Sequence, residues 1–341
     1  MLLSILIPAF NIEEYIKECI DSLIKQIKVE QMEVIVIDNA STDDTSNILD
    51  EYANKFIWLK VLHMKENIGL FKSRHIALKE AKGEYVMFLD GDDYVNDNCI
   101  ETIINDINNY CPNVILYRYS SFNEKKEFES PRLIDVSSPV LCDNNQLHSI
   151  RFEFASSDKI NNIWIKCIKR KVLYNMFDIN QFSDIKYGED RLNSIYIFSN
   201  NLILYEPKIL YNYRLRINST GSTFKIDRFI QNCRINSILF KEFVFKFNFE
   251  ENEIEYIIKY RIKSDMKLLL LGINNEVLKN KDLMDNIENI RTNYLEYNTI
   301  RKIHAGFLYN YIFKLFLKKK YKSIILISKI YGVLRYGRQF F

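Results

Sequence analysis

The chain has 341 residues, of which 48% are hydrophobic and 27% are charged, and its net charge at pH 7 is +3. This composition predicts a globular protein with a large core and excludes a disordered chain. The length suits one large domain with an appendage or two modest domains, and no apolar stretch is long enough and free enough of charge to span a bilayer.

The charge is distributed unevenly along the chain. No acidic residue follows Glu296, and the last 45 residues contain ten lysines and arginines. Residues 297–341 therefore carry +10, and because the whole chain carries +3, the residues before them carry −7. This basic tail predicts affinity for an anionic surface.

The cysteines and the amino terminus both favour a cytosolic protein. The six cysteines are scattered without a CxxC pair, so we expect reduced core residues and neither a zinc site nor a disulfide framework. The amino terminus lacks a basic region and reaches Pro8 at once, which predicts a first strand and not a signal peptide.

Strands and helices alternate along the first hundred residues. Continuous apolar runs predict buried strands at residues 2–8, 32–38, 58–64 and 85–90. Helical spacing of apolar residues predicts helices at about 12–27, 41–56 and 69–83, and Asn11 with Glu14 has the spacing of a capping box for the first of them. This alternation predicts an α/β fold with a mostly parallel sheet covered on both faces.

The pattern changes twice further along the chain. Mixed elements follow between about 95 and 220, and from about 224 onward the pattern is helical. We therefore predict a first domain at 1–222 and a helical carboxyl-terminal region at 223–341.

Three carboxylates directly follow the fourth apolar run. The segment reads FLDGDDY at residues 88–94 and contains Asp90, Asp92 and Asp93. Such a cluster is costly without positive charge, and Mg²⁺ or Mn²⁺ sites use one or two carboxylates together with phosphate oxygens. Asp38 ends the second strand at the same expected edge, where ligands of parallel sheets bind. Asp38 could instead be a turn or N-cap residue, and a lone DxD segment also occurs in turns and in phosphatase-type motifs.

Five ordered motifs resemble the family 2 glycosyltransferases, an inverting group with a GT-A-type nucleotide-sugar fold. They read SILIPAFN, VIDNASTDDT, ENIGLFKSRHIALKEAKGEYVMFLDGDD, IWIKCIKR and YGEDRLNSIYIF, and they cover roughly residues 3–218. The residues that this resemblance places around the nucleotide sugar are Pro8, Ala9, Phe10, Asn11, Glu13, Asp38, Asn67, Arg74, Asp90 and Gly91.

The resemblance also implies individual roles on the donor side. Asp38 would hold the uracil imide, Asn67 and Arg74 would contact the nucleoside, Asp90 would reach the ribose, and Asp92 would bind Mn²⁺ or Mg²⁺. The alternative for Arg74 is a solvated arginine on a helix face. Many family members have a second aspartate where this chain has Asn39, and we expect little consequence because Asp38 is kept.

The acceptor side is implied by two further motifs. Asp190 of the pair formed with Glu189 would be the catalytic base, because a sugar hydroxyl must lose its proton as it attacks; its alternative is a helix cap. Trp164 and Lys166 match an acceptor-contacting segment, although Ile165 replaces the usual asparagine. Arg214 or Arg216 would contact phosphate. The alternative for either arginine is a surface residue without a ligand.

The four histidines, His63, His75, His148 and His304, show no ligand spacing, so we expect structural roles for them. The basic tail predicts a helix lying at an anionic membrane interface, on the inner face of the cytoplasmic membrane. The alternative is a core-packed helical hairpin with a solvated basic face.

These patterns together favour a metal-dependent inverting glycosyltransferase. The donor would be a nucleotide sugar, UDP-hexose or UDP-N-acetylhexosamine, and the acceptor a growing lipooligosaccharide, capsule or other bacterial surface glycan. We expect no nucleic-acid partner. The rival functions are a sugar nucleotidyltransferase, which should carry a glycine-rich loop that PAFNIEEY lacks, and a non-catalytic membrane-bound scaffold.

Overall fold

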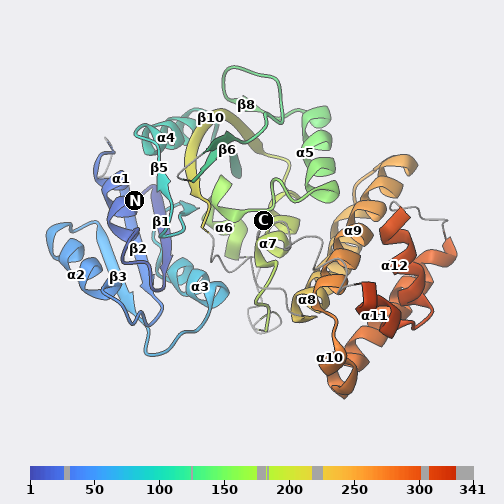
Figure 1. The fold of residues 1–341 in the computed structure, drawn as a ribbon. Coiled ribbons are helices and arrows are strands. Elements are labelled where there is room, and N and C mark those ends of the chain that lie inside the picture. The colour runs from blue at the N-terminus through green and yellow to red at the C-terminus, as the bar shows by residue number, and fades with distance from the viewer. Residues whose placement is uncertain are drawn as a thin grey trace. The chain divides into compact units, whose positions relative to one another are not determined.

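The computed structural model describes residues 1–26, 31–123, 126–174, 182, 184–216, 226–300 and 307–327. The chain forms two compact units (Figure 1). The first contains Met1–Arg151 and Ile160–Ile217, and the second contains Phe152–Lys159 and Asn218–Phe341. The second unit therefore includes a short segment from the middle of the sequence, which the boundary predicted at residue 222 does not foresee.

The first four long strands of the first unit form a parallel half-sheet, as predicted. They are β1 (Leu3–Ala9), β2 (Met32–Asp38), β3 (Leu59–His63) and β4 (Tyr85–Phe88), in the order β3-β2-β1-β4. Every neighbouring pair among them is parallel. Their apolar runs are buried because α3 packs on β1 and β2 while α2 packs on β3. The carboxyl ends of these strands consequently meet at one edge of the sheet.

The rest of the sheet is mixed in direction. Strand β9 (Lys166–Lys169) is antiparallel to both β4 and β6 (Val114–Phe122), and β10 (Ile203–Arg214) is parallel to β6. Short strands β5 (Tyr94–Val95) and β8 (Val140–Leu141) pair antiparallel with β10. The predicted parallel arrangement thus holds for the first half of the sheet, and β9 reverses the direction in the second half.

The α-helices up to residue 197 begin with the three that apolar spacing predicts. They are α1 (Ile16–Ile24), α2 (Thr45–Lys55), α3 (Leu70–Glu80), α4 (Cys99–Tyr110), α5 (Asn144–Ser156), α6 (Arg170–Tyr174) and α7 (Glu189–Ile197). The predicted capping box is wrong, because α1 begins only at Ile16. Asn11 lies in a turn with a φ of 50°, and its side-chain oxygen accepts a hydrogen bond from the backbone of Thr42.

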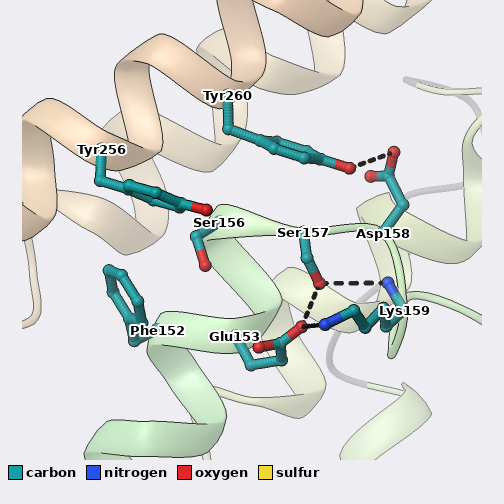
Figure 2. Close-up of a pocket in the computed structure, with 8 residues that line it drawn as sticks. All are labelled: Phe152, Glu153, Ser156, Ser157, Asp158, Lys159, Tyr256 and Tyr260. Atoms are coloured by element: carbon teal, nitrogen blue, oxygen red, sulfur yellow. Dashed lines mark hydrogen bonds and ion pairs between the residues drawn. The ribbon is translucent and has the colours of Figure 1, made fainter. Parts of the chain in front are cut away.

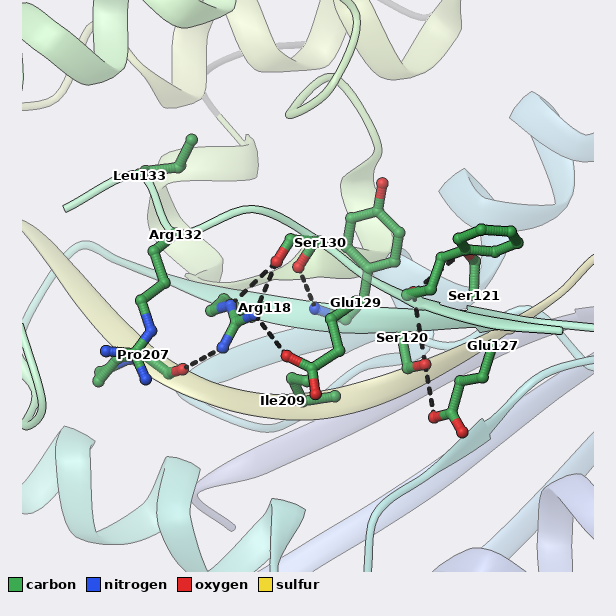
Figure 3. Close-up of polar contacts among 12 residues, drawn as sticks. Arg118, Ser120, Ser121, Glu127, Glu129, Ser130, Arg132, Leu133, Pro207 and Ile209 are labelled. Carbon is green, nitrogen blue, oxygen red and sulfur yellow. Dashed lines mark hydrogen bonds and ion pairs between the residues drawn. The ribbon is translucent and has the colours of Figure 1, made fainter. Parts of the chain in front are cut away.

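A half-buried arginine fixes the hairpin formed by β6 and β7 (Glu127–Glu129) (Figure 3). Arg118 donates hydrogen bonds to the Ser130 carbonyl at 2.7 and 3.1 Å and to the Glu129 carboxylate at 2.9 Å. The same guanidinium reaches the Pro207 carbonyl of β10 at 3.4 Å, where β10 carries a bulge. These contacts satisfy the Pro207 carbonyl at an irregular point of the sheet.

The described part of the second unit is helical, as predicted for the carboxyl-terminal region. Its helices are α8 (Ile226–Leu239), the π-helix η4 (Phe240–Val244), α9 (Glu251–Gly272), α10 (Asn275–Lys279), α11 (Lys281–Ile300) and α12 (Phe307–Leu317). They share a core that includes Phe229, Met266, Leu269, Phe316 and Ile324. Within the described residues, none of the helices combines the length and the hydropathy needed to span a membrane.

Candidate active site at the carboxyl edge of the sheet

Asp38 ends β2 and is held by three donors. Its carboxylate accepts hydrogen bonds from the Ser41 backbone at 3.1 Å, the Ser46 hydroxyl at 2.6 Å and the His63 ring at 2.8 Å. Burial alone would raise the pKa of Asp38, but these hydrogen bonds lower it below the usual aspartate value. Asp38 is therefore an ionised, oriented acceptor at the end of the strand.

His63 is a site residue that sequence reasoning missed. Its Nδ1 contacts Asp38, and its Nε2 lies 3.0 Å from the Asp50 carboxylate. The hydrogen bond to Asp38 raises the pKa of His63 above its usual value. The signal for this pairing is its position at the end of β3, directly opposite Asp38 in the strand register.

Asn39 and Asn67 form a second fixed pair beside Asp38. The Asn39 amide donates to the Asn67 side-chain oxygen at 2.9 Å, and its own oxygen accepts from the Ile68 backbone at 2.8 Å. An aspartate at position 39 would lack the first of these donors. Asn39, which departs from the family pattern, thus has a hydrogen-bonding partner in Asn67. The pair orders the loop that carries Asn67.

The segment after β1 is tied to the loop after β2. Asn11 exchanges hydrogen bonds with Thr42, and the Glu13 carboxylate accepts from the Asp44 backbone at 2.7 Å. Phe10 is 43% exposed, whereas Ala9 is buried. Of the donor-site residues expected here, Phe10 and Asn11 therefore present accessible surface, and Glu13 fixes the loop.

Gly91 packs closely against the same segment. A Cβ added at Gly91 would lie 2.5 Å from the Ile12 side chain and 3.3 Å from the Pro8 carbonyl oxygen. A larger side chain would displace the Ile12 side chain or shift the turn. Gly91 therefore allows the Asp90–Asp92 turn to pack closely on this segment.

Arg74 contacts carboxylates from two parts of the first unit that lie about a hundred residues apart in the sequence. One guanidinium nitrogen lies 2.8 Å from Asp90, and the other lies 2.6 Å from Asp190 and 3.6 Å from Glu189. The Arg74 side chain is only 6% exposed, so the solvated alternative is wrong. Both terminal nitrogens contact carboxylates of the chain, and the nucleoside contact expected of Arg74 stays a prediction.

Burial and the neighbouring Asp190 together raise the pKa of Glu189 to about 7, although Arg74 opposes the shift. Burial would lower the pKa of Arg74, but Asp190, Asp90 and Glu189 raise it well above the usual value. Arg74 consequently stays charged, and with three carboxylates around one guanidinium the cluster is net negative.

Two further arginines close the FLDGDDY turn. Arg216 is ion-paired with the Asp92 carboxylate, and Arg214 donates to the Asp92 carbonyl oxygen at 2.9 Å. Asp93 is buried and accepts from the Tyr211 hydroxyl at 2.6 Å and from the Arg214 backbone at 2.7 Å. Asp93 is therefore a structural residue, whereas Asp90 and Asp92 remain partly accessible.

The FLDGDDY turn supplies some of the ligands that a site for a hard cation needs. Burial and the neighbouring Asp90 raise the pKa of Asp92, which shows a carboxylate short of positive charge even with Arg216 beside it. Two accessible carboxylates suit Mg²⁺ or Mn²⁺ when diphosphate oxygens supply the remaining ligands. No group of three or more metal-ligating side chains exists among the residues that the model describes.

The expected acceptor contacts of Trp164 and Lys166 are not supported. Lys166 is fully buried, and its ammonium donates to the carbonyl oxygens of Ile160 at 2.8 Å and Asn162 at 2.5 Å. Burial lowers the pKa of Lys166 to about 7. Trp164 is 4% exposed and stacks on Tyr211, with ring centroids 4.5 Å apart. Trp164 therefore packs against β10, and Lys166 is a buried residue of β9.

The sequence comparisons agree with this geometry. The Glycosyl transferase family 2 model matches residues 4–169. Glycosyltransferase GlyG of Streptococcus pneumoniae is 30% identical over 226 residues, which cover 65% of this chain and 73% of GlyG. The chain belongs to glycosyltransferase family 2.

Two longer relatives match over a smaller share of their length. Poly(ribitol-phosphate) beta-N-acetylglucosaminyltransferase TarS of Staphylococcus aureus is 38% identical over 215 residues, 62% of this chain and 35% of TarS. Glycosyltransferase GlyA of S. pneumoniae is 29% identical over 222 residues, 64% of this chain and 31% of GlyA. The chain thus spans about a third of the length of these two relatives.

The fold is shared with solved structures of TarS. TarS 1–349 in complex with UDP has a TM-score of 0.67 at 21% identity, covering 99% of this chain and 92% of that one. The complex with UDP-GlcNAc has a TM-score of 0.64 at 22% identity, covering 99% and 88%. This likeness confirms the predicted fold, a GT-A-type α/β domain followed by a helical region.

Proposed function

We propose that the protein is a metal-dependent inverting glycosyltransferase that uses a UDP-linked hexose or N-acetylhexosamine. The observation that carries the proposal is the bridge from Asp90 through Arg74 to Asp190. It joins the strand-end turn suited to a metal and diphosphate with a carboxylate a hundred residues later in the sequence. Family membership and the UDP complexes of TarS support the donor class.

The donor would lie along the carboxyl edge of the sheet. Asp38 accepts the imide hydrogen of uracil, a donor suited to a fixed carboxylate, and Asn67 contacts the nucleoside. Asp90 accepts from the ribose, and Asp92 would hold Mn²⁺ or Mg²⁺. A bound cation would supply positive charge for the departing diphosphate. Arg216 moves from Asp92 to a phosphate oxygen, a partner of the same charge and geometry.

Asp190 takes the proton of the acceptor hydroxyl. Its Oδ1 is held by Arg74, whereas its Oδ2 has no hydrogen-bond partner among the described residues. The acceptor oxygen forms a bond to the anomeric carbon as the bond from that carbon to the diphosphate breaks. The proton passes to Oδ2 of Asp190, and the anomeric configuration inverts.

The acceptor would be a hydroxyl of a growing surface glycan: a lipooligosaccharide, a capsule or another bacterial polysaccharide. The name of TarS points to one such polymer class, a poly(ribitol phosphate), for that relative. Basic residues near the carboxyl end would hold the enzyme against an anionic membrane surface where such glycans are assembled.

Replacing Asp190 with asparagine tests the proposal. Asparagine keeps the shape and can still contact Arg74 through its oxygen, but it cannot accept the proton. Asp190→Asn should therefore keep thermal stability and UDP binding and lose sugar transfer by about 10² to 10⁴. Transfer and UDP-sugar hydrolysis are measured with Mn²⁺ and with a chelator, and Asp135→Asn on an exposed loop is the matched control.

The outcomes separate the rival functions. Wild-type transfer by Asp190→Asn would make Asp190 a helix cap and Glu189 the next candidate base. Release of pyrophosphate from a nucleoside triphosphate and a sugar phosphate would indicate a nucleotidyltransferase. If the protein neither binds UDP nor hydrolyses any UDP-sugar in a donor panel, the non-catalytic scaffold is the function that remains.

A further inference from the structure

A cavity of about 510 Å³ opens within the second unit, between the end of α5 and helix α9 (Figure 2). Its volume lies in the range of about 300–1,000 Å³ that is usual for small-molecule sites. Eight residues line it: Phe152, Glu153, Ser156, Ser157, Asp158, Lys159, Tyr256 and Tyr260. None of them belongs to the candidate active site of the first unit.

One wall of the cavity is aromatic. Tyr256 and Tyr260 are four residues apart on α9 and so share one helix face, and Figure 2 shows their side chains projecting together over the hollow. The ring of Phe152 lies across from Tyr256, with ring centroids 5.8 Å apart. Tyr256 is nevertheless 56% exposed, a large apolar surface beside a hollow. Such a ring can stack on the apolar face of a pyranose.

The lining also presents polar groups in fixed positions, from the end of α5 and from the tyrosines of α9. The Ser157 hydroxyl donates to Glu153 at 2.6 Å, Lys159 lies 3.2 Å from Glu153, and the Tyr260 hydroxyl donates to Asp158 at 3.2 Å. The hydroxyls of Ser156 and Tyr256, in contrast, make no hydrogen bond to any described residue. Two oriented carboxylates and two available hydroxyls are the partners that sugar hydroxyls need.

A buried arginine makes the α5 end of the lining rigid. Arg261 donates to the carbonyl oxygens of Phe154, Ala155 and Ser157 at 2.8 to 2.9 Å, and to the Asp158 carboxylate at 2.8 Å. It thereby satisfies carbonyls that the carboxyl end of α5 leaves unpaired. The cavity is preformed, so little ordering of the protein would oppose binding.

The charge of the lining selects the occupant. Glu153 is paired with Lys159, and Asp158 is paired with Arg261, so the charged groups at the cavity balance and match a neutral ligand better than a phosphodiester. We infer that this cavity binds a neutral sugar unit of the acceptor glycan. The inference rests on the proposed function for its ligand class.

Saturation-transfer NMR on the full chain tests the inference. The probes are methyl N-acetyl-β-glucosaminide, methyl β-glucoside and ribitol 5-phosphate, each measured with saturating UDP and diamagnetic Mg²⁺ to fill the donor site. We expect saturation of pyranoside ring protons and none of ribitol 5-phosphate. Tyr256→Ala should weaken pyranoside binding at least fivefold, and Ser156→Ala should weaken it by a smaller factor. Tyr311→Ala, which removes another exposed tyrosine of the second unit, should leave it unchanged.

Three results would overturn the inference: no pyranoside signal with the wild-type protein, equal signals for wild type and Tyr256→Ala, or binding of ribitol 5-phosphate alone. Thermal unfolding of each variant shows that the fold is retained. Donor hydrolysis by the same wild-type sample tests the proposed function separately, because a sample that hydrolyses UDP-sugar but binds no pyranoside contradicts only this inference.

Discussion

Arg74 is the side chain on which the arrangement of the candidate site depends most directly. It holds Asp90 and Asp190 at 2.8 and 2.6 Å through two nitrogens of one planar group. A lysine would supply a single point charge and could not reproduce both contacts at once. Arg74 therefore fixes the distance between Asp190, the proposed base, and the turn that contains Asp90.

His63 makes the folding stability of the first unit depend on pH. Its ring is placed between Asp38 and Asp50, and the hydrogen bond to Asp38 raises the pKa of His63 above 6.5. The protonated ring favours the folded state, so this stabilisation is fully present below pH 6.5 and is lost as the pH rises through the raised pKa. Thermal unfolding of wild type should therefore show a lower Tm at pH 8.5 than at pH 6.

The variant His63→Gln isolates that contribution. Glutamine has no charge to lose, so the Tm difference between pH 6 and pH 8.5 should be smaller than in wild type. His148→Gln on α5 serves as the control for loss of a histidine elsewhere. An unchanged difference in His63→Gln would show that other groups cause the pH dependence.

At the scale of elements, α4 and β10 are joined by two buried acids. Asp106 and Glu206 are 4% and 0% exposed, and one carboxylate oxygen of each has no hydrogen-bond partner. Burial and the neighbouring Glu206 together raise the pKa of Asp106 to about 7. At low pH the two groups share a proton, whereas at high pH two carboxylates face each other in the core.

The Asp106 pair should weaken the fold as the pH rises from about 4 to about 7. The folded chain keeps a proton on Asp106 that the unfolded chain releases, and each unit of pKa difference corresponds to about 1.4 kcal/mol. Asp106→Asn removes this titration and still supplies a donor to Glu206. Urea unfolding should show Asp106→Asn gaining stability relative to wild type between pH 5 and pH 8, whereas Asp285→Asn, exposed on α11, should show no such gain. A pH-independent difference would contradict the shared proton.

The sequence predicted those strands and helices whose formation depends on the apolar pattern of their own residues. The buried parallel strands β1, β2 and β4 were read directly from their apolar runs. The direction of β9 was not predictable, because its four residues include a buried lysine and its neighbours lie about eighty and fifty residues away. Helix α1 begins later than its apolar spacing suggests because tertiary hydrogen bonds to the loop after β2 occupy Asn11.

The candidate site was predictable only where a motif names a residue. Asp38 and Asp190 were found through the family resemblance, and the model places Asp190 beside the Asp90 turn. The acceptor role expected of Lys166 is not supported, because the carbonyl cage that buries it exists only once β9 and the preceding turn have folded. His63 and the Asn39–Asn67 pair were missed since their partners are defined by strand register and loop contacts.

At the scale of the whole molecule, the basic tail combines a buried side with a charged side. Ile312, Phe316 and Ile324 are fully buried in the core of the second unit, which agrees with the core-packed alternative over this part of the tail. Lys318, Lys320 and Lys322 are exposed, and residues 328–341 lie outside the described part of the chain. The apolar residues at 312, 316 and 324 are therefore unavailable for insertion into a bilayer.

Membrane attachment through the described tail should consequently be electrostatic. Each lysine near an anionic surface contributes about 1 kcal/mol, and the attraction is screened over about 8 Å at 0.15 M salt. We expect the protein to sediment with phosphatidylserine vesicles at 20 mM NaCl and to be released at 0.5 M NaCl. Reversing Lys318, Lys320 and Lys322 to glutamate should weaken binding at least tenfold, whereas reversing the exposed Lys17, Lys55 and Lys79 of the first unit should have a smaller effect. Binding that survives 0.5 M NaCl would instead indicate apolar insertion, and no sedimentation at 20 mM NaCl would exclude the anionic membrane as a partner of this chain.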